Sequence, residues 1–183
     1  MKAFTLVETL VAITVILLAV MGPFQLVQRS LTASYIARDH LVATALAEEG
    51  LEYVRSIRDS NYLYNIENPT ATRSWLYGLN TSAGAEENCF LANGCTVDPT
   101  RHGNNEAVAE CPTTCPTMKL NPTTMMYTQR VTGNVPTRFT RKVLLEQVNG
   151  SSDNRVKVTV TVTYISAQNS FDVTVTDYLY NWL

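Results

Sequence analysis

The chain opens with an apolar run and changes its pattern twice after it. Within residues 4–27, Glu8 is the only charged residue. As a helix, this run would rise roughly 36 Å at about 1.5 Å per residue, enough to cross a bilayer core of about 30 Å. A charge at membrane depth costs roughly 2.5–3.5 kcal/mol on insertion scales. The pattern therefore predicts a membrane-spanning helix over 4–28 and makes Glu8 a candidate functional residue.

A cleaved secretory signal peptide is the alternative for this run. Only Lys2 precedes it, whereas signal peptides begin with a basic region. The stretch LTASYIA, which could serve as a cleavage site, lies inside a continuing helical pattern. We therefore favour a retained anchor.

From about residue 29 the pattern becomes that of an amphipathic helix. Val42, Leu46, Tyr53 and Ile57 recur at helical spacing, and Gly50 lies on the same face. The opposite face carries the charged residues Arg38, Glu48, Glu52, Arg55 and Asp59. We predict one helix from about residue 4 to about residue 60, with 29–63 as its amphipathic half.

Gly22 and Pro23 interrupt the apolar run. Proline removes a backbone donor and crowds the preceding turn, and glycine adds flexibility, so a kink or local melting is expected there. A simple bend tolerated in a membrane helix is the alternative to a functional hinge.

Residues 64–122 are rich in Asn, Pro, Thr and Gly, and predict a loop region that Trp75 and Leu76 could attach to the core. All four cysteines lie in it: Cys89, Cys95, Cys111 and Cys115. An even number of cysteines in an exported domain suggests disulfides, and four cysteines allow three pairings. We favour the sequential pairing, because close partners meet first. Zinc, with His102 as a further ligand, is the alternative, but these spacings are poor for a zinc finger.

The period becomes two over residues 123–183. Four strands are predicted there, at 126–131, 138–148, 155–166 and 171–182. In the third, one face carries Val156, Val158, Val160, Val162 and Tyr164. We predict an α+β fold, in which a four-stranded antiparallel sheet packs on the amphipathic half of the helix.

The composition offers little for catalysis. The net charge is −2, and no nucleophile, metal-ligand or nucleotide-binding motif is present. Glu48, Glu49 and Glu52 fit a solvated helix face, and His40 has no partner motif. We expect no enzyme activity, cofactor or metal.

Basic residues concentrate in the predicted sheet. They are Arg130, Arg138, Arg141, Lys142, Arg155 and Lys157. Such a cluster could contact the phosphates of a nucleic acid, but it has no interleaved aromatic residues for stacking. We interpret these side chains as ordinary sheet surface, with nucleic-acid binding as the alternative.

The N-terminal stretch KAFTLVETLVAITVILLAV resembles the type IV prepilins and the type II secretion pseudopilins. In that family a short basic leader ends in a small residue, a Phe follows, and a Glu stands fifth after the cut. Here the leader is 1–3, the cut falls between Ala3 and Phe4, and Glu8 is fifth. Ala3 departs from the usual Gly, but Ala is tolerated in the family. The motif covers only about the first 25 residues.

The resemblance implies a function in filament assembly. A prepilin peptidase would remove the leader and methylate the Phe4 amine. Subunits would wait in membrane lipid, with the N-terminus cytoplasmic and the rest exported. They would then join other pilin subunits at an inner-membrane assembly platform, and the segment at Gly22 and Pro23 would unwind on entry. Glu8 would pair with the Phe4 cation of a neighbour and fix the register of the filament.

Three rival interpretations stay open at this point. The chain could be a secretion pseudopilin whose short filament acts as a piston. It could be a minor pilin that recognises DNA or a surface. It could also be an ordinary single-pass protein with an exported domain of another role.

Overall fold

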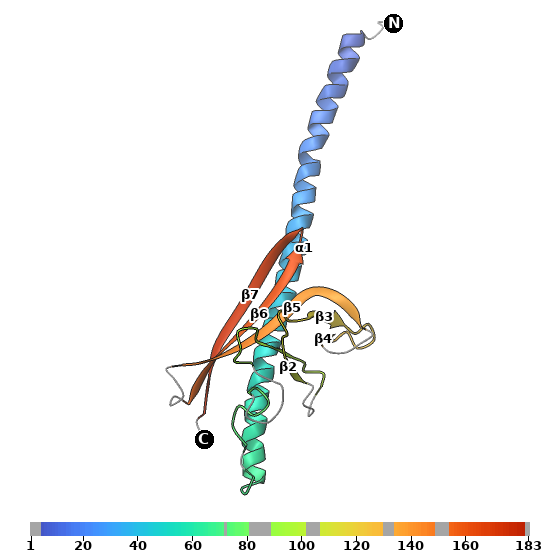
Figure 1. Ribbon diagram of the computed structural model, residues 1–183. Coiled ribbons are helices and arrows are strands. Elements are labelled where there is room, and N and C mark those ends of the chain that lie inside the picture. Colours follow the sequence, from blue (N-terminus) through green and yellow to red (C-terminus); the bar gives the residue numbers. More distant parts are fainter. Residues whose placement is uncertain are drawn as a thin grey trace. The chain divides into compact units, whose positions relative to one another are not determined.

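The computed structural model has an α+β fold and describes residues 5–71, 73–80, 89–101, 107–129, 134–148 and 154–181 (Figure 1). One long helix, α1, spans Leu6–Glu67. Seven strands follow: β1 Cys95–Val97, β2 Val108–Glu110, β3 Thr117–Leu120, β4 Tyr127–Thr128, β5 Val135–Gln147, β6 Arg155–Ser166 and β7 Asn169–Tyr180. The chain forms two compact units, Met1–Asp39 and His40–Leu183, which we describe one at a time.

The predicted long helix is confirmed, but it ends at Glu67 rather than near residue 60. Asn68 caps its end, since its side-chain Nδ2 donates to Tyr64 O at 3.0 Å beside the regular backbone bond from Asn68 N at 2.9 Å. Pro69 then disfavours a helical conformation for Asn68. The helix is continuous through Gly22 and Pro23, without the local melting that this pair suggests. Unwinding on assembly stays a prediction.

The sheet has seven strands rather than the four that we predicted. The additional strands, β1 to β3, lie inside the region predicted as loop and have only three or four residues each. A strand of that length shows too little alternation to be recognised in a sequence. The predicted antiparallel meander is confirmed for β5, β6 and β7, where Val143 faces Val160 and Val160 faces Val175.

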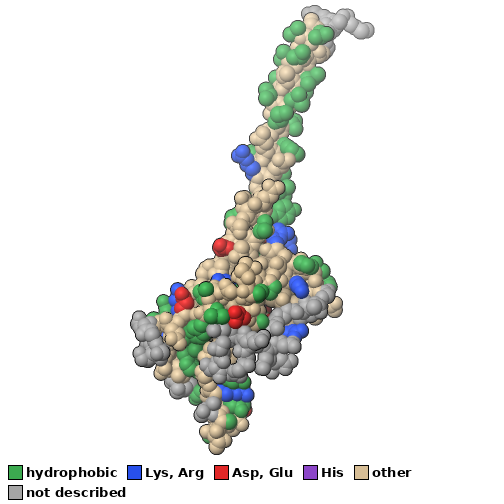
Figure 2. Space-filling view, viewed as in Figure 1, with side chains coloured by type: hydrophobic (Ala, Val, Ile, Leu, Met, Phe, Trp, Pro, Cys, Tyr) green, Lys and Arg blue, Asp and Glu red, His purple; other side chains and the backbone are tan. Residues whose placement is uncertain are grey.

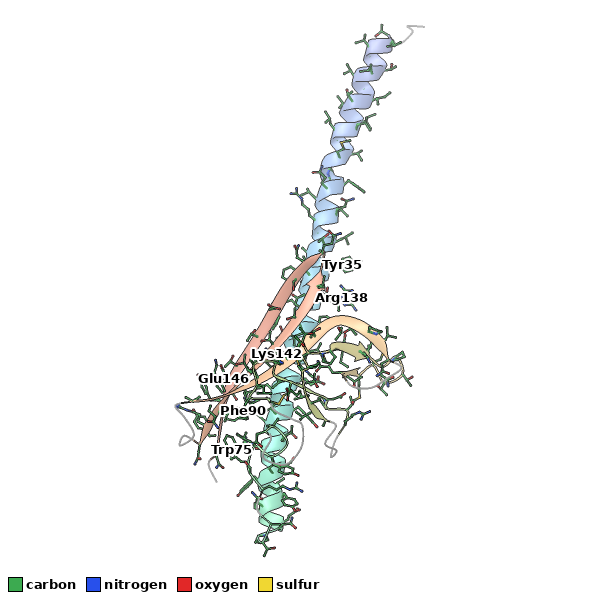
Figure 3. All side chains as sticks on the ribbon, in the orientation of Figure 1. Tyr35, Trp75, Phe90, Arg138, Lys142 and Glu146 are labelled. Atoms are coloured by element: carbon green, nitrogen blue, oxygen red, sulfur yellow. A yellow bond between two sulfur atoms is a disulfide. The ribbon has the colours of Figure 1, made fainter. Side chains whose placement is uncertain are left out.

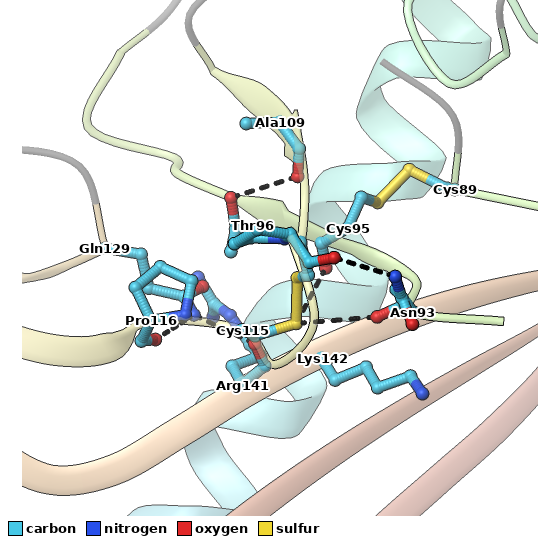
Figure 4. The surroundings of a disulfide bond; sticks show 12 residues. Cys89, Asn93, Cys95, Thr96, Ala109, Cys115, Pro116, Gln129, Arg141 and Lys142 are labelled. Carbon is cyan, nitrogen blue, oxygen red and sulfur yellow. Dashed lines mark hydrogen bonds between the residues drawn. A yellow bond between two sulfur atoms is a disulfide. The ribbon is translucent and has the colours of Figure 1, made fainter. Parts of the chain in front are cut away.

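Strand β5 is the centre of the sheet, because it pairs with three strands, β1, β3 and β6. One edge pairs with β6 along residues 139–147. On the other edge β3 pairs at Thr140 and β1 pairs at Val143. Between Thr140 and Val143, a side chain rather than a strand satisfies the backbone of β5. Gln129 Nε2 donates to Arg141 O at 2.8 Å (Figure 4).

The core of the His40–Leu183 unit lies between the second half of α1 and one face of the sheet. The predicted apolar face of β6 is confirmed, since Val156, Val158, Val160, Val162 and Tyr164 are all buried. On α1 the buried residues are Ala43, Leu46, Ala47, Gly50, Leu51, Tyr53, Val54 and Asn61. Leu76 is buried and Trp75 packs against the core, so this part of the loop region is attached as predicted.

Candidate functional site

The helix of the Met1–Asp39 unit exposes its apolar side chains. Between Leu6 and Val27 the large apolar residues are each more than half exposed, and Figure 2 shows them covering this part of the helix. Its most apolar 18-residue window has a mean hydropathy of 2.4, so α1 is long and apolar enough to cross a membrane. Apolar surface of this extent requires lipid or protein to cover it.

Two threonines in this segment hide their hydroxyl groups. Thr9 Oγ1 donates to Leu6 O and Thr14 Oγ1 donates to Val11 O, both at 2.8 Å. These bonds satisfy the hydroxyl groups within an apolar helix surface. The Glu8 carboxylate, by contrast, has no cation within ion-pair distance among the residues that the structure describes.

Glu8 also lies in the first turn of α1. Its backbone N donates to Thr5 Oγ1 at 3.3 Å, so Thr5 caps the helix. Thr5 and Glu8 have the spacing of a capping box, and a carboxylate in the first turn favours the helix dipole. Ala3 and Phe4, the predicted cleavage and methylation residues, lie outside the described residues.

Arg141 is the main correction to the predicted sheet surface. Its side chain is 0 % exposed and lies on the apolar face of β5, so it belongs to no basic surface. The guanidinium donates from Nη1 to Leu46 O at 2.8 Å and to Glu49 Oε2 at 2.6 Å, and from Nη2 to Val97 O at 2.7 Å. These bonds connect α1, β5 and β1.

The charge of Arg141 is retained despite its burial. Burial lowers the pKa of the guanidinium, and the neighbouring Glu49 opposes that effect. Arginine stays protonated in proteins. Its Nε has no hydrogen-bond partner among the described residues. A buried cation therefore depends on Glu49, whose side chain is 43 % exposed.

The other predicted basic residues do not form one free patch. Lys142 Nζ donates to Ala92 O at 2.7 Å, and Lys157 Nζ lies 3.1 Å from Glu146 Oε2. The guanidinium carbon of Arg155 lies 6.0 Å from the centroid of the Tyr178 ring. Arg138 is exposed on β5 (Figure 3). Arg130 lies outside the described residues.

A second ion pair joins α1 to β7 with the opposite polarity. Arg55 Nε donates to Asp177 Oδ2 at 3.2 Å, so the helix contributes the cation here and the anion at Glu49. The hydrogen bond from Arg55 lowers the pKa of the Asp177 carboxyl. Two pairs of opposite sense fix both the direction and the axial register of the helix half on the sheet.

Asp98 is a buried carboxylate at the end of β1. Its Oδ1 accepts from Thr100 Oγ1 at 2.6 Å, and its Oδ2 accepts from the Thr128 hydroxyl. Burial alone would raise the pKa of Asp98, but the hydrogen bonds from Thr100, Thr128 and the Gln129 backbone hold that pKa below its ordinary value. Asp98 thus joins the loop after β1 to β4.

The favoured disulfide pairing is confirmed. Cys89 pairs with Cys95 and Cys111 with Cys115, with Cα atoms 4.8 and 4.6 Å apart. Figure 4 shows the Cys89–Cys95 bond above β5, where Cys89 O accepts from Leu145 N at 2.9 Å. All four thiols are thus oxidised, and none is left as a zinc ligand.

Glu48, Glu49 and Glu52 on α1 differ in what their side chains contact. Glu48 is exposed, as predicted, and Glu52 pairs with Arg55 on the same helix. Glu49 instead binds Arg141, a contact that the helix pattern alone does not predict. His40 is exposed, and His102 lies outside the described residues. Within the described residues, no three His, Cys, Asp or Glu side chains form a group that could hold a metal ion.

Together these contacts define an α+β domain closed by two disulfides and attached to a helix of membrane-spanning length. No family model matches the chain, and neither the curated proteins nor the solved structures include a significant match.

Proposed function

We propose that the chain is a structural subunit of a type IV pilus-like filament. A prepilin peptidase would remove residues 1–3 and methylate Phe4, and the N-terminal helix would pass from lipid into the filament core. The proposal depends on one observation above all. The described helix places a single carboxylate, that of Glu8, in a long exposed apolar surface, five residues after the predicted cut.

The rest of the molecule is compatible with that role. The disulfides suit a domain exported to an oxidising compartment. The ion pairs of Arg55 and Glu49 attach α1 firmly to the sheet, so a force or contact applied to the helix would be transmitted to the domain. In this proposal the helix forms the filament core and the sheet domain its outer surface.

The proposal is tested on chains recovered from cells with and without an active prepilin peptidase. Mass spectrometry should find a mature chain that begins at a methylated Phe4, and only when the peptidase is active. Electron microscopy with an antibody to the sheet domain should label surface filaments. A mature chain that begins after residue 25 would instead indicate a signal peptide, and a processed chain without filaments would leave the assembly role unsupported.

A further inference from the structure

The turn between β3 and β4 carries two adjacent methionines that the solvent can reach. Met125 is 67 % exposed and Met126 is 56 % exposed. Met118, on β3 itself, is instead fully buried and belongs to the core of the domain. Packing therefore accounts for Met118 but not for Met125 and Met126.

Hydrogen bonds to Asn121 hold this turn closed. Asn121 N donates to Met126 O at 2.9 Å, and Met125 N donates to Asn121 O at 2.8 Å. The side-chain Oδ1 of Asn121 accepts from Thr123 N at 2.9 Å and from Thr124 N at 3.1 Å. These four bonds use the backbone and the Asn121 side chain, so a chemical change at either methionine sulfur would leave them intact.

The backbone conformation does not explain a methionine at position 125 either. Met125 has a φ of +57°, in the left-handed region that glycine and asparagine adopt more readily than other residues. Its exposed side chain also recovers little of that cost by burial. What methionine adds at this position is an accessible thioether, a group that oxidants convert to a sulfoxide.

No thiol competes with these two sulfurs for an oxidant. All four cysteines of the chain are paired in disulfides, which leaves no free thiol. A thiol would otherwise be an alternative target of the same oxidants. The exposed methionines are therefore the accessible oxidisable sulfurs of the sheet domain, and Met118 is a sulfur of the same kind that the core protects.

We propose that Met125 and Met126 form a reversible oxidation site for oxidants of the hydroperoxide class. The thioether sulfur attacks one peroxide oxygen, so that an S–O bond forms as the O–O bond breaks. Sulfur loses two electrons, the peroxide gains them, and its second oxygen takes up the proton and leaves as water. A methionine sulfoxide reductase reverses the change with two thiols, which become a disulfide while the oxygen leaves as water. The turn thus changes from apolar to polar while the domain stays folded.

The test treats the full chain in detergent micelles with increasing hydrogen peroxide and maps the added oxygen by mass spectrometry of its peptides. Met125 and Met126 should oxidise faster than Met118 by about tenfold or more, because a buried thioether reacts only after the domain opens locally. Thermal melting should be unchanged at the dose that oxidises both exposed residues. The two methionine sulfoxide reductases, one for each epimer, should then restore both thioethers. Met118 serves as an internal reference in the unaltered protein.

Two variants then locate the site. The double variant Met125→Leu, Met126→Leu should take up two oxygen atoms fewer per chain at that dose. Met118→Leu, the matched control in the core, should take up as many as the wild type. Leucine keeps the size and apolar character of methionine, and thermal melting confirms that each variant is folded. The proposal is overturned if Met118 oxidises as fast as the exposed pair, if oxidation of that pair lowers the melting temperature, if the reductases fail to restore it, or if the double variant takes up as much oxygen as the wild type.

Discussion

Gly50 on α1 leaves the space through which the side chain of Arg141 passes. A Cβ built on Gly50 would lie 3.0 Å from Arg141 Cδ and 3.1 Å from Val160 Cγ1. The helix thus approaches the sheet at the residue where the sheet carries a buried cation. This close approach brings Leu46 O and Glu49 within reach of one guanidinium.

Gly50→Ala should therefore destabilise the domain, although alanine is a better helix former than glycine by about 1 kcal/mol. Overpacking costs typically about 1–3 kcal/mol, so we expect a net loss of about 1 kcal/mol in the free energy of unfolding. Thermal melting of the sheet domain in the full chain measures it. Gly22→Ala is the matched control, because nothing lies within 4 Å of its added Cβ. A stabilising Gly50→Ala would mean that Arg141 can move aside.

Glu49 and Arg141 should show strong coupling in a double-mutant cycle. Glu49→Ala leaves a buried guanidinium without its anion, and breaking a buried pair in this way costs about 3–5 kcal/mol. Once Arg141 is replaced by Met, Glu49→Ala should cost much less, since Glu49 is 43 % exposed and water can solvate it. We expect a coupling energy of about 3 kcal/mol. Glu48→Ala, in an exposed neighbour, serves as the control, and additive effects of Glu49→Ala and Arg141→Met would contradict the assignment.

The alternation of residues along β5 indicates that Arg141 faces the core, although its charge suggests an exposed position. Phe139, Arg141, Val143 and Leu145 alternate along β5 and all are buried, so the period of two places the arginine on the apolar face. Asp177 likewise continues the inward series of β7, between Val175 and Leu179. Alternation indicates the face, but a partner on a distant helix decides whether a charge is tolerated there.

The short strands could not be predicted for a different reason. β1 and β2 have three residues each, and β3 has four. Their positions depend on disulfides, on Asp98 and on the side chain of Gln129, none of which has a local pattern. The long helix and the β5–β7 meander, by contrast, bury continuous stripes of apolar side chains. The spacing of these apolar residues alone predicts both elements.

The pH dependence of stability should reflect Asp98. Because the pKa of Asp98 is lowered in the folded state, its contribution is complete above the ordinary value of 3.8 and is lost as pH falls through the lower folded value. Asp98→Asn should cost about 1–3 kcal/mol at pH 7 and flatten the acid side of the melting-temperature profile.

Asp177→Asn is the comparison for this pH profile. The pKa of Asp177 is lowered in the same direction, by Arg55, but both side chains are 35 % exposed. A pair with that exposure contributes at most about 1 kcal/mol. A larger acid effect from Asp177 than from Asp98 would contradict the ranking.

Gly94 should be essential to the disulfide loop at residues 89–95. It has a φ of +67°, and a Cβ there would lie 2.5 Å from Val143 O. Gly94→Ala should therefore force the loop away from β5 and expose Cys89–Cys95 to reductant, at a cost of about 2 kcal/mol. Alkylation of thiols under mild reduction measures the exposure. Gly78→Ala provides the control, since Gly78 also has a positive φ but nothing lies within 4 Å of its added Cβ.

Glu8 has two possible roles, and one substitution separates them. As part of a capping box with Thr5 it would stabilise the first turn, a role that glutamine performs equally well. As the partner of a neighbour's Phe4 cation it would need its charge. Thr5→Val, which removes the cap alone, should cost about 1 kcal/mol of helix stability and still allow filaments.

We expect Glu8→Gln and Glu8→Leu both to abolish filaments while the chain still inserts, is cleaved and folds. Either change removes a charge from an apolar segment, so insertion should be unharmed. The sheet domain should melt as in the wild type, because Glu8 is not among the described residues that form its core. In the filament, however, each Phe4 cation would be buried without its anion, at about 3–5 kcal/mol for every subunit. The measurement is filament yield by electron microscopy beside the amount of processed protein in the membrane. Normal filaments with Glu8→Gln as the main subunit would assign Glu8 to capping and would contradict the charge-pairing role.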